Sequence, residues 1–368
     1  MNLRKKIYTD FNEELEIIWK KFEENSNNFC FQNFHWLKNW YSNLNQENKP
    51  KIYNVLVYHN AELIMILPLC VNTINKKKYL TWQGGGTADY MCCLLGKKFF
   101  LEKKIFLKLW SEIQNEIKFF DIIHFFRQPK KINELYNPFV IYLFNNKEGY
   151  SSSISLEKDF DSFLKKIKKK FINDTARSVK NLKKIGDLEF EIYKDFQKEN
   201  ILPKLQLLLK NKIKRLEEKK IKNFFNTESF KFYENFDKKY YENGFLHFSS
   251  LSIKKKNISL HWGVVYKKTF YYLLPSILDT SFFKYSPGRI HLLELIKWSI
   301  NNNIQKFDFT IGDENYKKNW TNREELLYTH IKINNLRASN AYIFIYLKII
   351  LKKINFIKRI YKNIKNII

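Results

Sequence analysis

The chain has 368 residues, of which 45% are hydrophobic and 17% aromatic, and its formal net charge is +28. This composition excludes a disordered chain, and the length suits two domains of roughly 100–200 residues each. Four cysteines without metal-type spacing exclude a disulfide framework, so we expect a reducing cytoplasm and no metal. No apolar run reaches the roughly 18 residues of a transmembrane helix, and the basic N-terminus lacks the apolar core of a signal peptide.

The positive charge is a weak indication of a nucleic-acid partner. Only eight of the 65 basic residues are arginine, and lysine, asparagine, isoleucine and phenylalanine are abundant. These four amino acids have A/T-rich codons, so a biased genome produces such a composition by itself. Proteins that read nucleic acids rely on arginine for bidentate contacts. We therefore do not expect nucleic acid as a partner.

Residues 1–150 are predicted to form an α+β domain. Helices are expected at Asp10–Glu24, His35–Leu44 and Phe99–Lys118. Strands are expected at Lys51–Tyr58, Glu62–Cys70, Lys78–Trp82, Phe120–Phe126 and Phe139–Phe144, the first two forming a hairpin. The polar stretch Lys147–Ser153 is expected to be the domain boundary.

Residues 151–335 are predicted to form a second domain of the same class. Its helices are expected at Leu156–Lys170, Asp174–Lys184, Glu199–Lys219, Thr227–Glu242 and Arg289–Asn302. Its strands are expected at Leu188–Tyr193, Phe245–Ile253, Asn257–Tyr266, Thr269–Pro275, Gln305–Thr310 and Glu325–Ile333. Both halves place helices before a hairpin, a further strand and a helix, which indicates two copies of one mixed-sheet fold.

The last segment, residues 336–368, is predicted to be a basic amphipathic helix at Asn340–Ile367. Its apolar stripe consists of Ile343, Leu347, Ile350, Ile354, Ile357, Tyr361 and Ile364. Such a helix can lie on an anionic membrane surface or dock onto the protein's own core, and the pattern leaves both open.

A turn at residues 285–289 precedes the helix that starts at Arg289. The letters are Tyr285, Ser286, Pro287, Gly288 and Arg289. Proline cannot continue a strand, and glycine permits close approach of a ligand to the backbone. The unpaired N–H groups of a helix start suit the pyrophosphate of a nucleotide-like cofactor, although the same letters also make a plain turn.

The next conspicuous block follows the strand after that helix. It runs Phe307-Asp308-Phe309-Thr310-Ile311-Gly312-Asp313-Glu314-Asn315-Tyr316-Lys317-Lys318-Asn319-Trp320. Together with the turn, it resembles the CelD/BcsL-like branch of the GNAT acetyltransferase superfamily over about 36 contiguous residues. The resemblance implies two tandem GNAT-like domains, as in Fem-type aminoacyltransferases. It also implies acetyl-CoA or another acyl-CoA as co-substrate at residues 285–289. One departure is that Gly288 replaces the glycine-richer phosphate loop of the superfamily.

GNAT chemistry is attack of an amine on a thioester, which needs a base and a proton for the leaving thiolate. Asp308, Asp313 and Glu314 are the candidate carboxylates, and Tyr316 is the candidate acid; a cap, an ion pair to Lys317 or aromatic packing would explain them equally. Candidate acceptor contacts are Lys317 and Trp320, with Gly85, Asp89 and Tyr90 in the first domain. His261 lies beside the expected cofactor path but also suits a core position.

The expected function is N-acylation, above all N-acetylation, of an amine such as an amino sugar in bacterial surface-polysaccharide assembly. The acceptor is expected to be a small molecule or lipid-linked, and the protein to be cytoplasmic or peripheral on the inner membrane face. Two alternatives stay open: a Fem-type transferase that uses aminoacyl-tRNA, and a non-catalytic protein that binds anionic membrane or nucleic acid.

Overall fold

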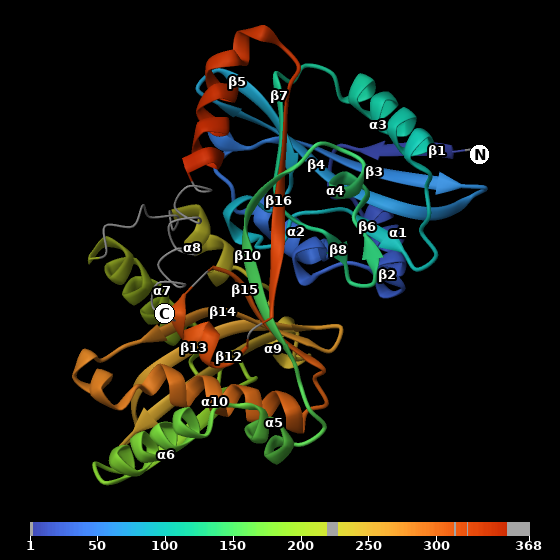
Figure 1. The fold of residues 1–368 in the computed structure, drawn as a ribbon. Helices are drawn as coiled ribbons and strands as arrows, with labels where there is room; N and C mark the ends of the chain where they lie inside the picture. The colour runs from blue at the N-terminus through green and yellow to red at the C-terminus, as the bar shows by residue number, and fades with distance from the viewer. Residues whose placement is uncertain (1–2, 219–226, 313, 322, 352–368) are drawn as a thin grey trace. The chain divides into compact units, whose positions relative to one another are not determined.

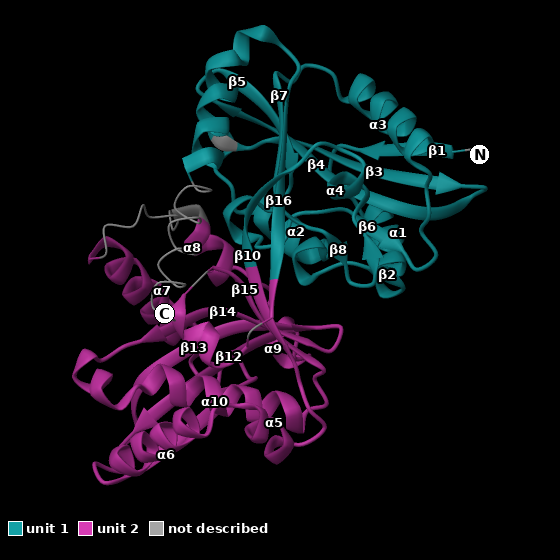
Figure 2. Cartoon of the chain, viewed as in Figure 1, with its two compact units in different colours: residues 1–150, 325–368 teal, residues 151–324 magenta. Residues whose placement is uncertain are grey.

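The computed structural model describes residues 3–218, 227–312, 314–321 and 323–351 (Figure 1). The chain divides into two compact units, Met1–Tyr150 with Glu325–Ile368, and Ser151–Glu324 (Figure 2). Each unit contains mixed sheet flanked by helices, so the predicted fold class is confirmed.

The first unit has a sheet with strand order β1-β3-β4-β5-β7-β16, and β6 joins β2 to β4. All ladders are antiparallel except β5 with β7. The strands are β1 (Leu3–Tyr8), β2 (Ser26–Asn27), β3 (Lys51–His59), β4 (Glu62–Ile74), β5 (Lys77–Trp82), β6 (Leu94–Gly96), β7 (Ile122–Pro129) and β16 (Glu324–Ile333). A separate small hairpin is formed by β8 (Lys131–Ile132) and β9 (Leu135–Tyr136).

The α-helices that accompany this sheet include α1 (Glu13–Glu24), α2 (Phe34–Ser42), α3 (Lys103–Ile117) and α4 (Pro138–Ile141). The first two begin where predicted to within three residues, because Asn12 and Asn33 cap their first turns through side-chain oxygens. The predicted strand Phe139–Phe144 is wrong. Pro138 occupies the first helical position after the cap Asn137, and the short helix α4 forms there instead.

The boundary segments differ from the prediction in two places. The polar stretch Lys147–Ser153 lies inside a strand, β10 (Asn146–Ser155), whose residues 151–155 pair with β15 in the second unit. The strand predicted as the end of the second domain, β16, instead pairs antiparallel with β7, from Leu327 opposite Pro129 to Ile333 opposite Ile122. Residues 325–335 therefore belong to the first unit.

The second unit has a sheet with strand order β10-β15-β14-β13-β12-β11. Neighbours are antiparallel except β14 and β15. The further strands are β11 (Leu188–Tyr193), β12 (Leu246–Ile253), β13 (Lys256–Tyr266), β14 (Thr269–Ile277) and β15 (Lys306–Ile311). The three long central strands, β12 to β14, match the prediction because each is rich in apolar residues and consecutive strands are joined by Lys-Lys turns.

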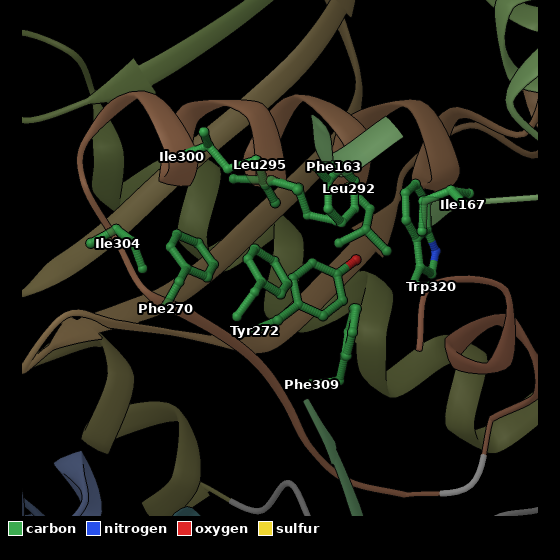
Figure 3. Packing of buried hydrophobic residues seen from close by; sticks show 12 residues of the cluster. Phe163, Ile167, Phe270, Tyr272, Leu292, Leu295, Ile300, Ile304, Phe309 and Trp320 are labelled. Atoms are coloured by element: carbon green, nitrogen blue, oxygen red, sulfur yellow. The ribbon is translucent and has the colours of Figure 1, made fainter. Parts of the chain in front are cut away.

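Helices cover both faces of this sheet (Figure 1). One face carries α5 (Phe160–Lys166), α6 (Lys169–Lys183) and α10 (Pro287–Asn301), and the other carries α7 (Ile201–Glu218), α8 (Thr227–Glu234) and α9 (Lys239–Glu242). Figure 3 shows the core beneath α10, where Leu292, Leu295 and Ile300 point toward the strand residues Phe270 and Tyr272. Phe270 stacks on Phe307 at 4.8 Å between ring centroids, which joins β14 to β15 at the start of both strands.

Residues 339–351 are helical and show two apolar faces. Tyr342, Ile345 and Ile349 pack on Ile122 and Ile331 of the first unit. The predicted apolar stripe is not the face that packs on the first unit, because its members Ile343 and Leu347 are 52% and 51% exposed. The members of the stripe from Ile354 onward lie outside the described residues. Among the described helices, none combines the length and the apolar character needed to cross a bilayer.

Candidate functional site

The turn before α10 has a left-handed residue at its centre. Ser286 adopts φ 53° and ψ 54°, and Pro287 is the first residue of the helix. The backbone oxygen of Ser286 accepts from the N–H groups of Arg289 and Ile290 at 3.0 and 3.3 Å. Proline has no N–H, so Gly288 supplies the first helical N–H that is directed along the helix axis at this end.

The strands beside this turn pair only at their beginnings. β14 and β15 are parallel over three residue pairs, ending with Tyr271 and Asp308. Beyond that point β15 carries a bulge in its ladder with β10, and Thr310 has a φ of 57°. A bulge turns a strand away from its neighbour, and the two strands separate there.

A pocket of about 740 Å³ lies at this separation, within the second unit. Its walls come from the end of β14, the turn and first residues of α10, the segment after β15, and α6 and α7. The lining residues are Phe171, Lys212, Arg215, Leu216, Ser259, Tyr272, Pro275, Ser276, Ile277, Phe283, Ser286, Pro287, Gly288, Arg289, Leu292, Glu314, Tyr316, Asn319 and Trp320.

The predicted cofactor turn lies on this pocket wall from Ser286 to Arg289, whereas Tyr285 packs on Ile290 outside the lining. Part of the Arg289 guanidinium is held by neighbouring side chains. Its Nη2 donates to Ser178 Oγ at 3.0 Å, and the guanidinium lies 5.2 Å from the Phe171 ring centroid. Its buried Nε makes no hydrogen bond with the described residues. Burial lowers the pKa of Arg289.

The block after β15 brings Glu314, Tyr316 and Trp320 to the same pocket. Burial raises the pKa of Tyr316, and the neighbouring Tyr272 and Glu314 raise it further. The side chain is nevertheless 38% exposed. The hydroxyl is protonated at neutral pH, as a tyrosine of ordinary pKa already is, and it has a proton to donate.

Lys317 is an interior residue. Its side chain is 4% exposed, and its ammonium lies 2.9 Å from Glu314 Oε2 and donates to the Ile311 oxygen at 2.8 Å. It also contacts Gly312, whose φ of 114° excludes a side chain. Lys317 therefore holds the turn that carries Glu314, and it is not among the pocket-lining residues.

Asp308 lies behind the pocket. Its side chain is fully buried, its Oδ1 accepts from the Thr310 N–H at 2.8 Å, and its Oδ2 lies 3.0 Å from Lys306 Nζ. These contacts stabilise the bulge in β15 and do not direct the carboxylate into the pocket. Asp313 lies outside the described residues.

Three predicted acceptor residues lie in the first unit. Gly85 has a φ of 50°, and a Cβ there would lie 3.1 Å from Trp40 Nε1. Asp89 Oδ1 is 3.8 Å from Arg127 Nη1, and Tyr90 is a core residue that packs against Phe29 and Phe31. The structure does not place these residues in the pocket described above.

A buried histidine cluster lies between the sheet and α10. His291 bonds to Ser259 and Ser249 at 2.9 Å through its two ring nitrogens. The ring nitrogens of His247 and His261 have no hydrogen-bond partner among the described residues, and His261 stacks on Tyr272 at 4.5 Å. Burial lowers the pKa of His247 and of His291 to about 3, and it lowers that of His261 as well. His261 is therefore a neutral core residue that supports the pocket floor.

Sequence reasoning missed the contribution of α7 to the pocket. Lys212 and Arg215 lie one turn apart on that helix and line the pocket. The chain has 65 basic residues, so two more on a helix gave no signal. Among the described residues, no group of three His, Cys, Asp or Glu side chains is placed to hold a metal ion.

Comparison with known proteins agrees with this architecture. Residues 169–318 match the family model described as an acetyltransferase (GNAT) domain. No curated protein matches the sequence.

Three solved structures share the fold over most of both chains. FemX shows 12% identity and a TM-score of 0.58, with 89% of this chain and 97% of FemX covered. L-PGS from Bacillus licheniformis shows 9% identity and a TM-score of 0.55, with 95% and 98% covered. A tandem GNAT protein from the clavulanic acid biosynthesis pathway shows 8% identity and a TM-score of 0.50, with 90% and 98% covered.

The fold and the matched domain support an acyltransferase of the GNAT type. Residues 169–318, which match the acetyltransferase (GNAT) domain, carry both the Ser286–Arg289 turn and the Glu314 and Tyr316 side chains.

Proposed function

We propose that the protein is an acyl-CoA-dependent N-acyltransferase, with acetyl-CoA as the expected donor. The observation that carries this proposal is the pocket between the end of β14 and the segment after β15, which opens beside the N-terminus of α10 and is lined mostly by residues of the matched domain. A helix N-terminus stabilises an anion, and a separated strand edge leaves backbone groups free for an extended ligand.

The residues around the turn suit the phosphates of such a donor. Gly288 has no side chain, and a Cβ there would lie 3.2 Å from Ile277 Cδ1, so any larger residue would crowd the pocket wall. Arg289 adds positive charge beside the helix start. The thioester of the donor would supply the activated acyl group.

The remaining chemistry needs a proton acceptor and a proton donor. We assign Glu314 as the base that takes the proton of the acceptor's ammonium, because its carboxylate lines the pocket. Asp313 is the alternative base. Tyr316 would protonate the leaving thiolate, since its hydroxyl is protonated at neutral pH. Asp308 supports the site through the β15 bulge.

A direct assay tests this function. Purified protein would be mixed with acetyl-CoA and a panel of amines, including amino sugars and their nucleotide-linked forms, and thiol release would be followed. Amine-dependent release is expected. Absence of donor binding together with absence of release for every amine would refute an acyl-CoA transferase.

The acceptor and pathway rest on the sequence resemblance. The Ser286–Arg289 turn and the block ending at Trp320 support the CelD/BcsL-like branch, and we propose an amino sugar of bacterial surface-polysaccharide assembly as the acceptor. Trp320 borders the pocket, but it is 3% exposed and packs edge-on to Phe171 at 5.0 Å, so it supports the wall against which a sugar would lie.

A second candidate is a Fem-type transferase that takes its acyl group from aminoacyl-tRNA. The shared fold with FemX and the net charge of +28 favour it. Aminoacyl-tRNA-dependent transfer without any acetyl-CoA binding would select this candidate.

We also propose peripheral contact with anionic lipid through helix 339–351. The face opposite its docked side exposes Ile343, Phe344, Leu347 and Leu351 by more than half, and residues 326–368 contain nine basic and no acidic side chains. Apolar side chains next to positive charge suit a surface of anionic lipid headgroups.

Flotation with vesicles of phosphatidylglycerol and phosphatidylcholine tests this contact. The wild type is expected to float, and Ile343→Gln with Leu347→Gln is expected to stay in solution while the docked residues remain packed. Ile17→Gln, at an isoleucine 69% exposed on α1, is the control. Equal flotation of the double variant would contradict the proposed contact.

A further inference from the structure

Two cations of α7 stand on the pocket wall across the sheet from α10. Lys212 and Arg215 are three positions apart, so both lie on one face of the helix, and that face lines the pocket. The preceding residue, Asn211, fixes the helix there: its Nδ2 donates at 2.7 Å to Ser276 Oγ and to the Ile277 oxygen. The cations are thus attached to the end of β14, where the pocket begins.

Cations outnumber carboxylates among the described residues that line the pocket. The described lining residues include three cations, Lys212, Arg215 and Arg289, and one carboxylate, Glu314. Glu314 lies 2.9 Å from Lys317 behind the wall, so part of its charge is already balanced from outside the lining. A ligand that fills this pocket therefore gains from carrying negative charge.

Arg215 is also held in place. Its guanidinium lies 5.2 Å from the ring centroid of Phe283, which itself lines the pocket. Stacking on an aromatic ring restricts a guanidinium and lowers the entropy cost when it binds an anion. A guanidinium and an ammonium one helical turn apart suit a phosphoryl group with several acceptor oxygens.

We propose that Lys212 and Arg215 bind a phosphoryl group on the amine acceptor, so the enzyme selects phosphorylated amines. The inference rests on the proposed function. The donor's phosphates are assigned to the start of α10, on one face of the sheet, while α7 covers the other face (Figure 1). A second anion-binding subsite, on α7, would bind the phosphoryl group of the amine acceptor.

Calorimetry can test this assignment with glucosamine 6-phosphate and glucosamine as probes on protein saturated with CoA. We expect the phosphorylated probe to bind roughly 10- to 100-fold more tightly, as charge-assisted bonds to two cations allow. In Lys212→Gln with Arg215→Gln, that preference should vanish while CoA affinity stays within about twofold. Lys210→Gln with Lys214→Gln removes the same charge from exposed positions of α7 and should keep the preference.

Two results would overturn the inference while the proposed function stands. One is equal affinity of both probes for wild type saturated with CoA. The other is a tenfold or larger loss of CoA affinity in the variant with both Lys212 and Arg215 replaced, which would show that these cations bind the donor. Failure of wild type to bind CoA at all would instead refute the proposed function.

Discussion

Among the strand pairings described above, two are parallel, and the space beside one is filled by side chains whereas the space beside the other is a pocket. In the first unit β5 and β7 pair in parallel only at Tyr79 with Ile122 and Leu80 with Ile123. In the second unit β14 and β15 pair in parallel over three residues. A helix, α3 or α10, lies between the two strands of each parallel pair in sequence, and the first pair also has the short strand β6 before its helix.

Aromatic rings fill the first of these places. Trp82, the last residue of β5, stacks on Phe125 of β7 at 4.6 Å, and Phe139 of α4 lies edge-on to both rings at 5.0 and 5.6 Å. In the second unit the corresponding space is the 740 Å³ pocket with cations and Tyr316 on its walls. Side-chain volume at the place where the two strands separate therefore decides whether it becomes a packed core or a pocket.

The largest expected effect concerns the base in the open pocket. Glu314→Gln should reduce turnover by about 10²–10⁴-fold, because the glutamine cannot accept the ammonium proton. Partial recovery at high pH is expected, since the free amine needs no base. Asp313→Asn, measured beside it, should show a mild loss with no such recovery. A severe, alkali-rescued loss in Asp313→Asn and near-normal turnover in Glu314→Gln would move the base to Asp313.

A substitution in the aromatic core beside β5 and β7 should lower the stability of the first unit and leave turnover unchanged. Phe139→Ala removes a fully buried ring that contacts Trp82, Phe106, Trp110 and Phe125, so the free energy of unfolding of the first unit should fall by about 3–5 kcal/mol. Chemical denaturation measures this loss. Turnover per folded molecule should stay unchanged, and a drop in turnover without a stability change would assign the first unit a direct role in the reaction.

Acid should weaken the second unit through its buried histidines. Burial lowers the pKa of His247 and of His291 to about 3, below the ordinary value of 6.5. The unfolded chain binds these protons first, so stability is fully present above about pH 6.5 and falls as the pH drops toward 3. His247→Phe should reduce the slope by about 1.4 kcal/mol per pH unit between pH 6 and 4. An unchanged slope in denaturation curves would show that His247 titrates normally.

How far the sequence predicted the structure depends on how local the determinants are. Strand β11 has the predicted bounds because its alternation is local, and the Ser286–Arg289 turn was recognisable because proline and glycine restrict the backbone directly. The sequence predicts a strand at Phe139–Phe144, where α4 forms, because periodicity in a six-residue apolar run cannot separate a strand from a helix. Strand β10 was missed because a ladder with β15 orders its polar residues.

The site was predictable only in part for the same reason. Gly288 and Tyr316 belong to two short sequence patterns, the turn before α10 and the block after β15. Both residues could therefore be predicted as site residues. Lys212 and Arg215 enter the pocket through packing of α7 on β14, which no local pattern encodes. The interior position of Lys317 likewise follows from the backbone around Gly312 and not from its own residue type.

Calorimetric titration with acetyl-CoA tests the central claim that the open strand separation holds the donor and the filled one does not. The account predicts one site per chain in the wild type and loss of binding in Gly288→Val, where the added side chain meets Ile277. Gly86→Val, whose Cβ would point into open space in the first unit, should bind as the wild type does. Two sites per chain, or equal affinity in Gly288→Val and wild type, would contradict the account.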